Sequence, residues 1–131
     1  MCQDLIIIFV CEHGAAKSVI AAAYFNKLAI DKGLELRAIA RGTNPDNELS
    51  ANTIAGLHED SLTPTGNVPQ KLSIEDMKSA QRIISFCELP EEYHRKTAIE
   101  RWDDIPPVGE NYEKARDAIL ERIESLMKEL R

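Results

Sequence analysis

The residues with the clearest chemical potential lie near the N-terminus, in the run Cys11-Glu12-His13-Gly14-Ala15-Ala16-Lys17-Ser18. The small residues after the thiol let successive backbone N–H groups turn toward one point. A helix that begins near Ser18 aims the positive end of its dipole at the same point. Such a field favours the thiolate, the nucleophilic form of cysteine, while Lys17 adds charge and the Ser18 hydroxyl can donate to the sulfur. The run therefore predicts an oxyanion-binding loop around a reactive Cys11.

The alternative for this cysteine is a buried, unreactive thiol at the end of a strand, because free cysteine is among the most buried residue types. The small-residue loop and the helix start that follow at once favour the reactive interpretation.

The elements that must position the loop form a βαβ unit. Residues 4–10 are continuously apolar, as in a strand of a parallel sheet covered on both faces. Apolar residues at helical spacing follow over 18–32, Gly33 supplies a C-terminal stop, and residues 34–40 form a second strand. This order of elements places the loop at the carboxyl end of the first strand.

The rest of the chain continues the same alternation. We expect helices over 48–59 and from the Ser73 capping box, strands over 82–87 and 96–99, loops over 61–71 and 102–109, and a final helix from Tyr112. The prediction is one α/β domain over 1–131, a doubly wound sheet of about four parallel strands with helices on both faces. Such sheets bind ligands beyond the carboxyl ends of their strands.

Composition narrows the classes of function. The net charge is −6, with 16 basic and 22 acidic residues, and the cations are scattered, which argues against nucleic-acid binding. The three cysteines form neither a C-x-x-C pair nor a disulfide framework, so we expect no metal or other cofactor. The N-terminal apolar run is too short for a signal peptide or a membrane span, so we expect a cytoplasmic protein.

The loop resembles that of the low-molecular-weight protein tyrosine phosphatases and of the arsenate reductases that share their fold. Their signature is an apolar strand followed by Cys, five residues, Arg and Ser, and this chain matches the strand, Cys11, the spacing and Ser18. The similarity continues through the strand that ends at Cys87, the segment 102–104 and the final helix, so it covers nearly the whole chain. The resemblance implies that Cys11 attacks phosphorus while residues 12–18 bind the oxyanion.

Two substitutions set this loop apart from the family it resembles. Lys17 stands where the family has arginine, and Gly14 stands where it has asparagine. Arginine grips an oxyanion with two parallel N–H bonds, whereas lysine offers a point charge on a flexible stem. Because phosphoryl transfer depends mainly on positioning and charge stabilisation, we expect the change to weaken catalysis more than anion binding.

The resemblance also implies a general acid. The family phosphatases protonate the leaving oxygen with an aspartate that precedes a proline, and the usual Asp-Pro pair is absent here. Counting back from the final helix aligns Asp103 with the acid, whereas counting from Trp102 aligns Pro106. Asp103 and Asp104 are thus both candidates, with two solvated loop carboxylates as the alternative.

Cys87 resembles the cysteine with which thioredoxin-coupled arsenate reductases attack the nucleophile. Residues 88–102 contain no further cysteine, which excludes a complete three-cysteine relay. A Cys11–Cys87 disulfide and simple packing of Cys87 at a strand end both remain open.

Three functions follow from the sequence. The first is a phosphatase that forms phosphocysteine on Cys11 from a tyrosine phosphate-type substrate. The second is arsenate reduction with Cys11 and an external thiol or Cys87, and the third is a catalytically weak oxyanion-binding or regulatory module. The expected partners are a phosphate-like oxyanion or phosphorylated substrate and, for the reductase, a thiol reductant.

Overall fold

A parallel sheet forms the centre of the protein. The computed structural model describes residues 5–64, 66, 68–93 and 99–129, with the strand order β2-β1-β3-β4. The strands are β1 (Leu5–Cys11), β2 (Leu36–Gly42), β3 (Ala80–Ser85) and β4 (Ile99–Arg101). The helices are α1 (Lys17–Asp31), α2 (Ala51–Glu59), α3 (Ile74–Ser79) and α4 (Tyr112–Glu129), with a 3-10 turn at Glu91–Tyr93. The predicted α/β class and its parallel strands are confirmed.

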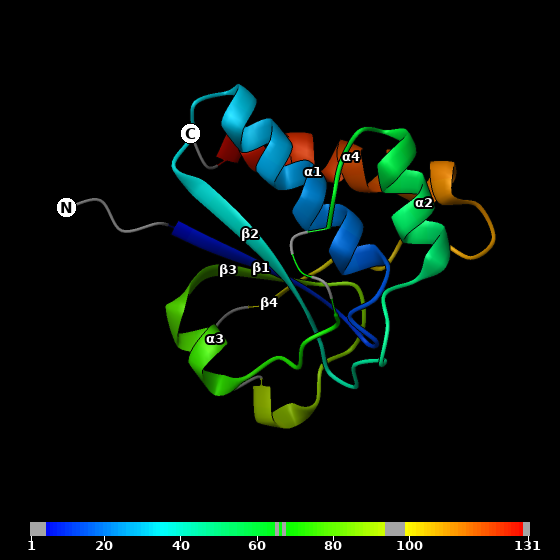
Figure 1. Cartoon of the computed structure of the whole chain (residues 1–131). Helices are drawn as coiled ribbons and strands as arrows, with labels where there is room; N and C mark the ends of the chain where they lie inside the picture. Colours follow the sequence, from blue (N-terminus) through cyan, green and yellow to red (C-terminus); the bar gives the residue numbers. More distant parts are fainter. Residues whose placement is uncertain (1–4, 65, 67, 94–98, 130–131) are drawn as a thin grey trace.

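The strand β1 is apolar along its length because both of its faces are buried. Ile7 and Phe9 lie in the core that α1 and α4 cover, and Ile8 and Val10 lie in the opposite core beneath α3. Figure 1 shows α1, α2 and α4 on one side of the sheet and α3 on the other. Helices therefore cover both faces, as the continuous apolar run predicts.

Several boundaries differ from those expected. The helix predicted from 48 begins at Ala51, because Ser50 accepts a hydrogen bond from the Thr53 amide and caps it. The strand predicted at 82–87 is β3, which ends at Ser85. The strand predicted at 96–99 falls mostly on residues 94–98, which lie outside the described residues, and β4 begins at Ile99.

The capping box of α3 is confirmed: Ser73 and Asp76 each bond the other's backbone N–H. Among the described residues, no helix is both long and apolar enough to cross a membrane.

Candidate active site

Cys11 ends β1 at the point of the sheet where the strand order reverses. In the order β2-β1-β3-β4 the connection after β1 leads to one side and the connection after β3 leads to the other, and the crevice beyond such a switch point is where open α/β sheets bind ligands. A cleft of about 400 Å³ opens there. It is lined by the loops at the strand ends, through Cys11, Glu12, His13, Ala15, Ala16, Lys17, Asp46, Ser50, Phe86, Cys87, Pro107, Val108 and Gly109.

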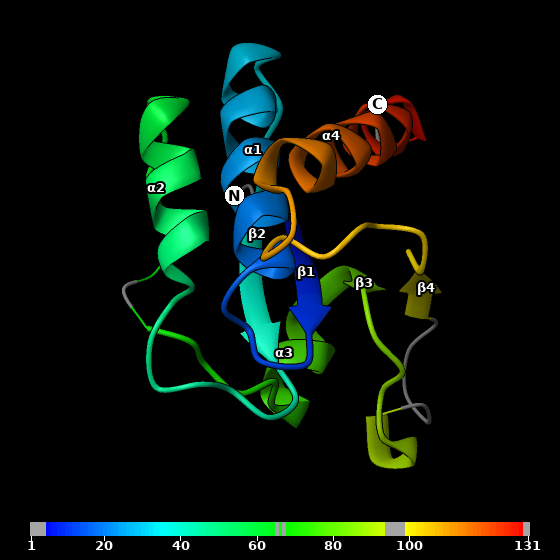
Figure 2. The same ribbon diagram turned by 90° about the vertical axis from the view of Figure 1, so that its right-hand side faces the viewer.

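The carbonyl groups of the loop after β1 are turned away from the cleft by the segment 43–50. The amides of that segment bond to carbonyl oxygens of the loop: Thr43 to Cys11, Asn44 to Glu12, Asp46 to His13 and Ser50 to Ala15, at 2.7–3.3 Å. Figure 2 shows this segment beside the loop between β1 and α1. The carbonyl acceptors are thus occupied on one side of the loop.

The amides of the same loop differ from its carbonyl groups in their hydrogen bonding. Within the described part of the chain, the N–H groups of residues 12–16 make no hydrogen bond. The helix α1 begins at Lys17, and its N-cap residue, Ala16, has no side chain that could accept from the first amides of the helix. Successive free N–H groups and uncapped helix N-termini are features with which proteins bind anions, and this loop presents both.

Two glycines set the curvature of this loop. Gly14 has a φ of +61°, in the left-handed region that favours glycine. A Cβ on Gly42, at the end of β2, would lie 2.7 Å from the Gly14 nitrogen and 2.9 Å from the His13 carbonyl carbon. The loop can therefore lie against β2 only because Gly42 has no side chain.

The Cys11 sulfur lies beside a buried hydroxyl group. Ser18 Oγ lies 3.0 Å from Cys11 Sγ, and both residues are buried. A hydroxyl at this distance stabilises negative charge on the sulfur when it donates its proton. The structure thus brings Cys11 and Ser18 together as the sequence predicts.

The Lys17 amine makes a contact that the sequence does not reveal. Its Nζ donates to the carbonyl oxygen of Ile105 at 3.0 Å. Since Pro107, Val108 and Gly109 form a wall of the cleft, Lys17 ties the anion loop to that wall.

His13 lies on the rim of the cleft, half exposed, between two carboxylates. Its Nδ1 is 3.2 Å from Asp46 Oδ1 and 3.3 Å from the Asn44 carbonyl oxygen, and its Nε2 is 3.7 Å from Glu12 Oε2.

The two candidate acids point toward arginines. Arg101 pairs with Asp103 at 2.7 Å, and Arg122 pairs with Asp104 at 2.6 Å. The bond from Arg122 holds the pKa of Asp104 below its usual value. Neither carboxylate lines the cleft, so the structure does not bring them to Cys11.

Cys87 lines the same cleft as Cys11, two residues beyond β3. Burial raises the pKa of its thiol, and the contact with Ser85 Oγ, 3.6 Å from Sγ, offsets this only in part. Both cysteines are free thiols. Among the described residues, no group of three or more His, Cys, Asp or Glu side chains is arranged to hold a metal ion.

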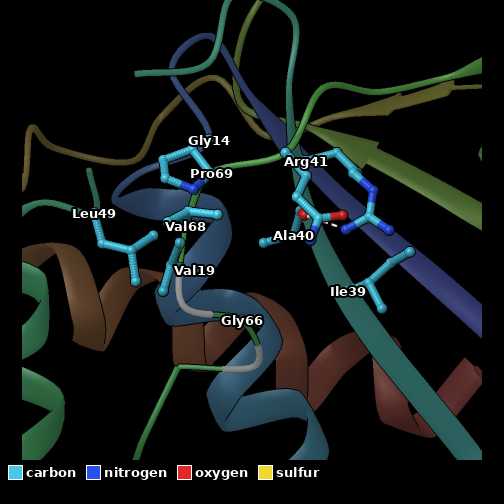
Figure 3. Close-up of a pocket in the computed structure, with 10 residues that line it drawn as sticks. Gly14, Val19, Ile39, Ala40, Arg41, Leu49, Gly66, Val68 and Pro69 are labelled. Atoms are coloured by element: carbon cyan, nitrogen blue, oxygen red, sulfur yellow. Dashed lines mark hydrogen bonds between the residues drawn. The ribbon is translucent and has the colours of Figure 1, made fainter. Parts of the chain in front are cut away.

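A second pocket, of about 160 Å³, borders Gly14 instead of Cys11. Figure 3 shows Val19 and Leu49 along it, with Val68 and Pro69 from the segment that crosses over it.

The sequence interpretation missed the contribution of the segment after β2. Asp46 and Ser50 line the cleft, and the signal that could have found them is their place after a strand parallel to β1, because the carboxyl ends of parallel strands meet at one edge.

The fold and the site together define a doubly wound α/β protein with a buried thiol where its first strand ends. Residues 6–105 match the model of the low molecular weight phosphotyrosine protein phosphatase family. The chain therefore belongs to this family.

Solved structures with the same fold include both phosphatases and arsenate reductases. A low molecular weight protein tyrosine phosphatase from T. tengcongensis is 18% identical with a TM-score of 0.82, over 95% of this chain and 99% of that one. A YwlE mutant from Bacillus subtilis is 23% identical with a TM-score of 0.81, over 96% and 98%. An arsenate reductase from Archaeoglobus fulgidus is 24% identical with a TM-score of 0.72, over 92% and 97%.

Proposed function

We propose that this protein is a phosphatase that transfers the phosphoryl group of a phosphate monoester, of the tyrosine phosphate type, to Cys11 and then to water. The observation that supports it is the loop itself: a buried thiol 3.0 Å from Ser18 Oγ, followed by amides that no acceptor among the described residues uses. The Cys11 thiolate attacks phosphorus, the bond to the leaving oxygen breaks, and water later releases phosphate and restores the thiolate.

The other residues of the loop stabilise the charge that develops on the transferred phosphoryl group. The N–H groups of residues 12–18 stabilise the charge on the equatorial oxygens, and the Lys17 ammonium adds a donor beside them. The assignment of the proton donor to Asp103 or Asp104 stays a prediction, since both carboxylates are paired with arginines.

The test is detection of the covalent intermediate. After incubation with p-nitrophenyl phosphate and rapid acid quench, mass spectrometry should find one phosphoryl group on the Cys11 peptide, and turnover should disappear in Cys11→Ser. Cys2→Ser is the matched cysteine control and should keep both signals. Neither adduct nor turnover in the wild-type protein would contradict the proposal.

Arsenate reduction is the second candidate, favoured by the presence of Cys87 in the same cleft as Cys11. Cys11 would form an adduct with As(V), and attack of Cys87 or an external thiol on the Cys11 sulfur would form a disulfide as As(V) becomes As(III). Thiol oxidation that needs arsenate, does not occur with phosphate, and is lost in Cys11→Ser would establish this reaction instead.

A catalytically weak oxyanion-binding module is the third candidate, favoured by the bond between Lys17 and the Ile105 carbonyl. It requires phosphate to bind with turnover near background and predicts that Lys17→Arg, which restores a bidentate donor, raises turnover. If the arginine variant gains nothing, lysine is not what limits the reaction.

A further inference from the structure

We propose that His13, oriented by Asp46, is the proton donor for the leaving group in this phosphatase reaction. The inference rests on the proposed function of Cys11 and assigns a catalytic residue to it. It starts from the side chains of the cleft.

The described titratable groups that line the cleft are Cys11, Glu12, His13, Lys17, Asp46 and Cys87. Cys11 is the nucleophile, and the Lys17 ammonium donates a hydrogen bond to the Ile105 carbonyl oxygen. Burial raises the pKa of Cys87, which makes its thiol a weaker acid. The carboxylates of Glu12 and Asp46 lie 3.7 and 3.2 Å from the imidazole nitrogens, where they face a donor and act as acceptors.

The candidate acids outside the cleft are engaged elsewhere. Arg122 lowers the pKa of Asp104, so this carboxyl has no proton to give at neutral pH. The Asp103 carboxylate pairs with Arg101 at 2.7 Å, and its side chain is 64% exposed.

The surroundings of the imidazole assign its two nitrogens different roles. Nδ1 faces two acceptors, Asp46 Oδ1 at 3.2 Å and the Asn44 carbonyl oxygen at 3.3 Å, and therefore carries a hydrogen. This leaves Nε2, 3.7 Å from Glu12 Oε2, as the nitrogen that passes a proton to the leaving group. A carboxylate that orients the ring through one nitrogen, while the other nitrogen exchanges the proton, is the usual arrangement of a histidine acid–base group.

The proton balances over the two half-reactions. As the Cys11 sulfur bonds to phosphorus and the P–O bond to the leaving group breaks, the Nε2 proton passes to the departing oxygen. The neutral imidazole then takes a proton from the attacking water, the S–P bond breaks, and phosphate leaves with the thiolate and the imidazolium restored.

The experiment compares two esters in the same variants. Phenyl phosphate releases a basic phenolate that needs a proton, whereas 2,4-dinitrophenyl phosphate releases an anion that does not. We expect His13→Gln to lower kcat/KM for phenyl phosphate on the order of 10²-fold and for the dinitrophenyl ester only a few-fold. Asp46→Asn should show the same selectivity more weakly, because Asp46 only orients the ring.

His58→Gln is the matched control, since His58 is exposed on α2 and outside the cleft. Equal losses for both esters in His13→Gln would overturn the assignment. It would also be overturned if Asp103→Asn or Asp104→Asn lost activity selectively toward phenyl phosphate while His13→Gln did not. These outcomes leave the Cys11 adduct intact and so separate a failure of His13 from a failure of the proposed function. Absence of any turnover in the wild-type protein would overturn both.

Discussion

At the scale of single residues, the contact between Ser18 and Cys11 is the most direct link from packing to chemistry. Ser18 is fully buried on the first turn of α1, and its Oγ lies 3.0 Å from the nucleophile. Burial of a hydroxyl group is unfavourable unless it forms a hydrogen bond, and the contact with the Cys11 sulfur supplies that bond.

Ser18→Ala should therefore reduce the reactivity of Cys11 with little change in fold. Loss of a hydrogen bond to a charged group is worth about 1.5–3 kcal/mol, so we expect kcat/KM to fall roughly 10- to 100-fold. Iodoacetamide alkylation of Cys11 at neutral pH, followed by mass spectrometry, should slow as well.

The chain offers a matched serine for this experiment. Ser85 is also fully buried, but its Oγ contacts Cys87 at 3.6 Å. Ser85→Ala should alter alkylation of Cys87 and not of Cys11. An unchanged alkylation rate at Cys11 in Ser18→Ala would show that the hydroxyl does not act on the nucleophile.

At the scale of elements, the site depends on how closely the loop after β1 approaches the end of β2. Gly42→Ala would place a methyl group 2.7 Å from the Gly14 nitrogen, against backbone that has no room to yield. We expect the loop to shift away from the segment 43–50 and kcat/KM to fall on the order of 10²-fold.

The measurement for Gly42→Ala is kcat/KM together with the free energy of unfolding in urea. Gly66→Ala is the control, because its added methyl meets nothing closer than 4.0 Å. Full activity in Gly42→Ala would show that the loop does not need this contact.

A second glycine sets the packing of α2 on α4. A Cβ on Gly56 would lie 2.3 Å from the Tyr112 ring, whose hydroxyl is held by Asp60 at 3.2 Å. Alanine would favour the helix by about 1 kcal/mol, whereas overpacking costs about 1–3 kcal/mol, so we expect Gly56→Ala to destabilise the protein.

Urea unfolding measures this balance, and a double-mutant cycle with Tyr112→Leu identifies its cause. If the clash is responsible, Gly56→Ala should cost less in the Tyr112→Leu background. Gly109→Ala, where an added Cβ meets nothing within 4 Å, is the control for stability. A Gly56→Ala variant more stable than the wild type would contradict the clash.

At the scale of the whole molecule, local sequence patterns predicted the βαβ unit and the place of Cys11, because an apolar strand, a small-residue loop and a helix start are adjacent in the chain. They could not predict the bond from Lys17 to Ile105, which spans 88 residues. They also could not decide whether Asp103 or Asp104 is the general acid, because the direction of each side chain depends on its arginine partner.

The helix α1 shows the same limit for packing. The helical spacing of apolar residues over 18–32 indicated one buried face, but residues 18–25 are all buried because α1 packs against both the sheet and α4. On α4, by contrast, the buried residues Ala115, Ile119, Ile123 and Leu126 follow one helical face, because the opposite face of that helix meets solvent.

A network around Asp60 joins the helices α1, α2 and α4. Asp60, just after α2, accepts hydrogen bonds from Tyr24 of α1 and from Tyr112 and Arg116 of α4. Burial alone would raise the pKa of Asp60, but the bonds from the two tyrosines and from Arg116 outweigh it and lower the pKa. Burial and the negative charge of Asp60 raise the pKa of Tyr112 to about 12.

These shifts predict how stability depends on pH. A carboxyl whose pKa is lower in the folded state contributes stability above its unfolded pKa of about 4, and this contribution is lost as pH falls through the folded value. Asp60→Asn should therefore reduce the free energy of unfolding at pH 7 by roughly 2 kcal/mol and flatten its decline between pH 5 and 2. Urea titrations across this range measure both effects. Asp104→Asn is the control, because its exposed pair with Arg122 should leave stability at pH 7 nearly unchanged. An acid limb as steep in Asp60→Asn as in the wild type would place the acid sensitivity elsewhere in the fold.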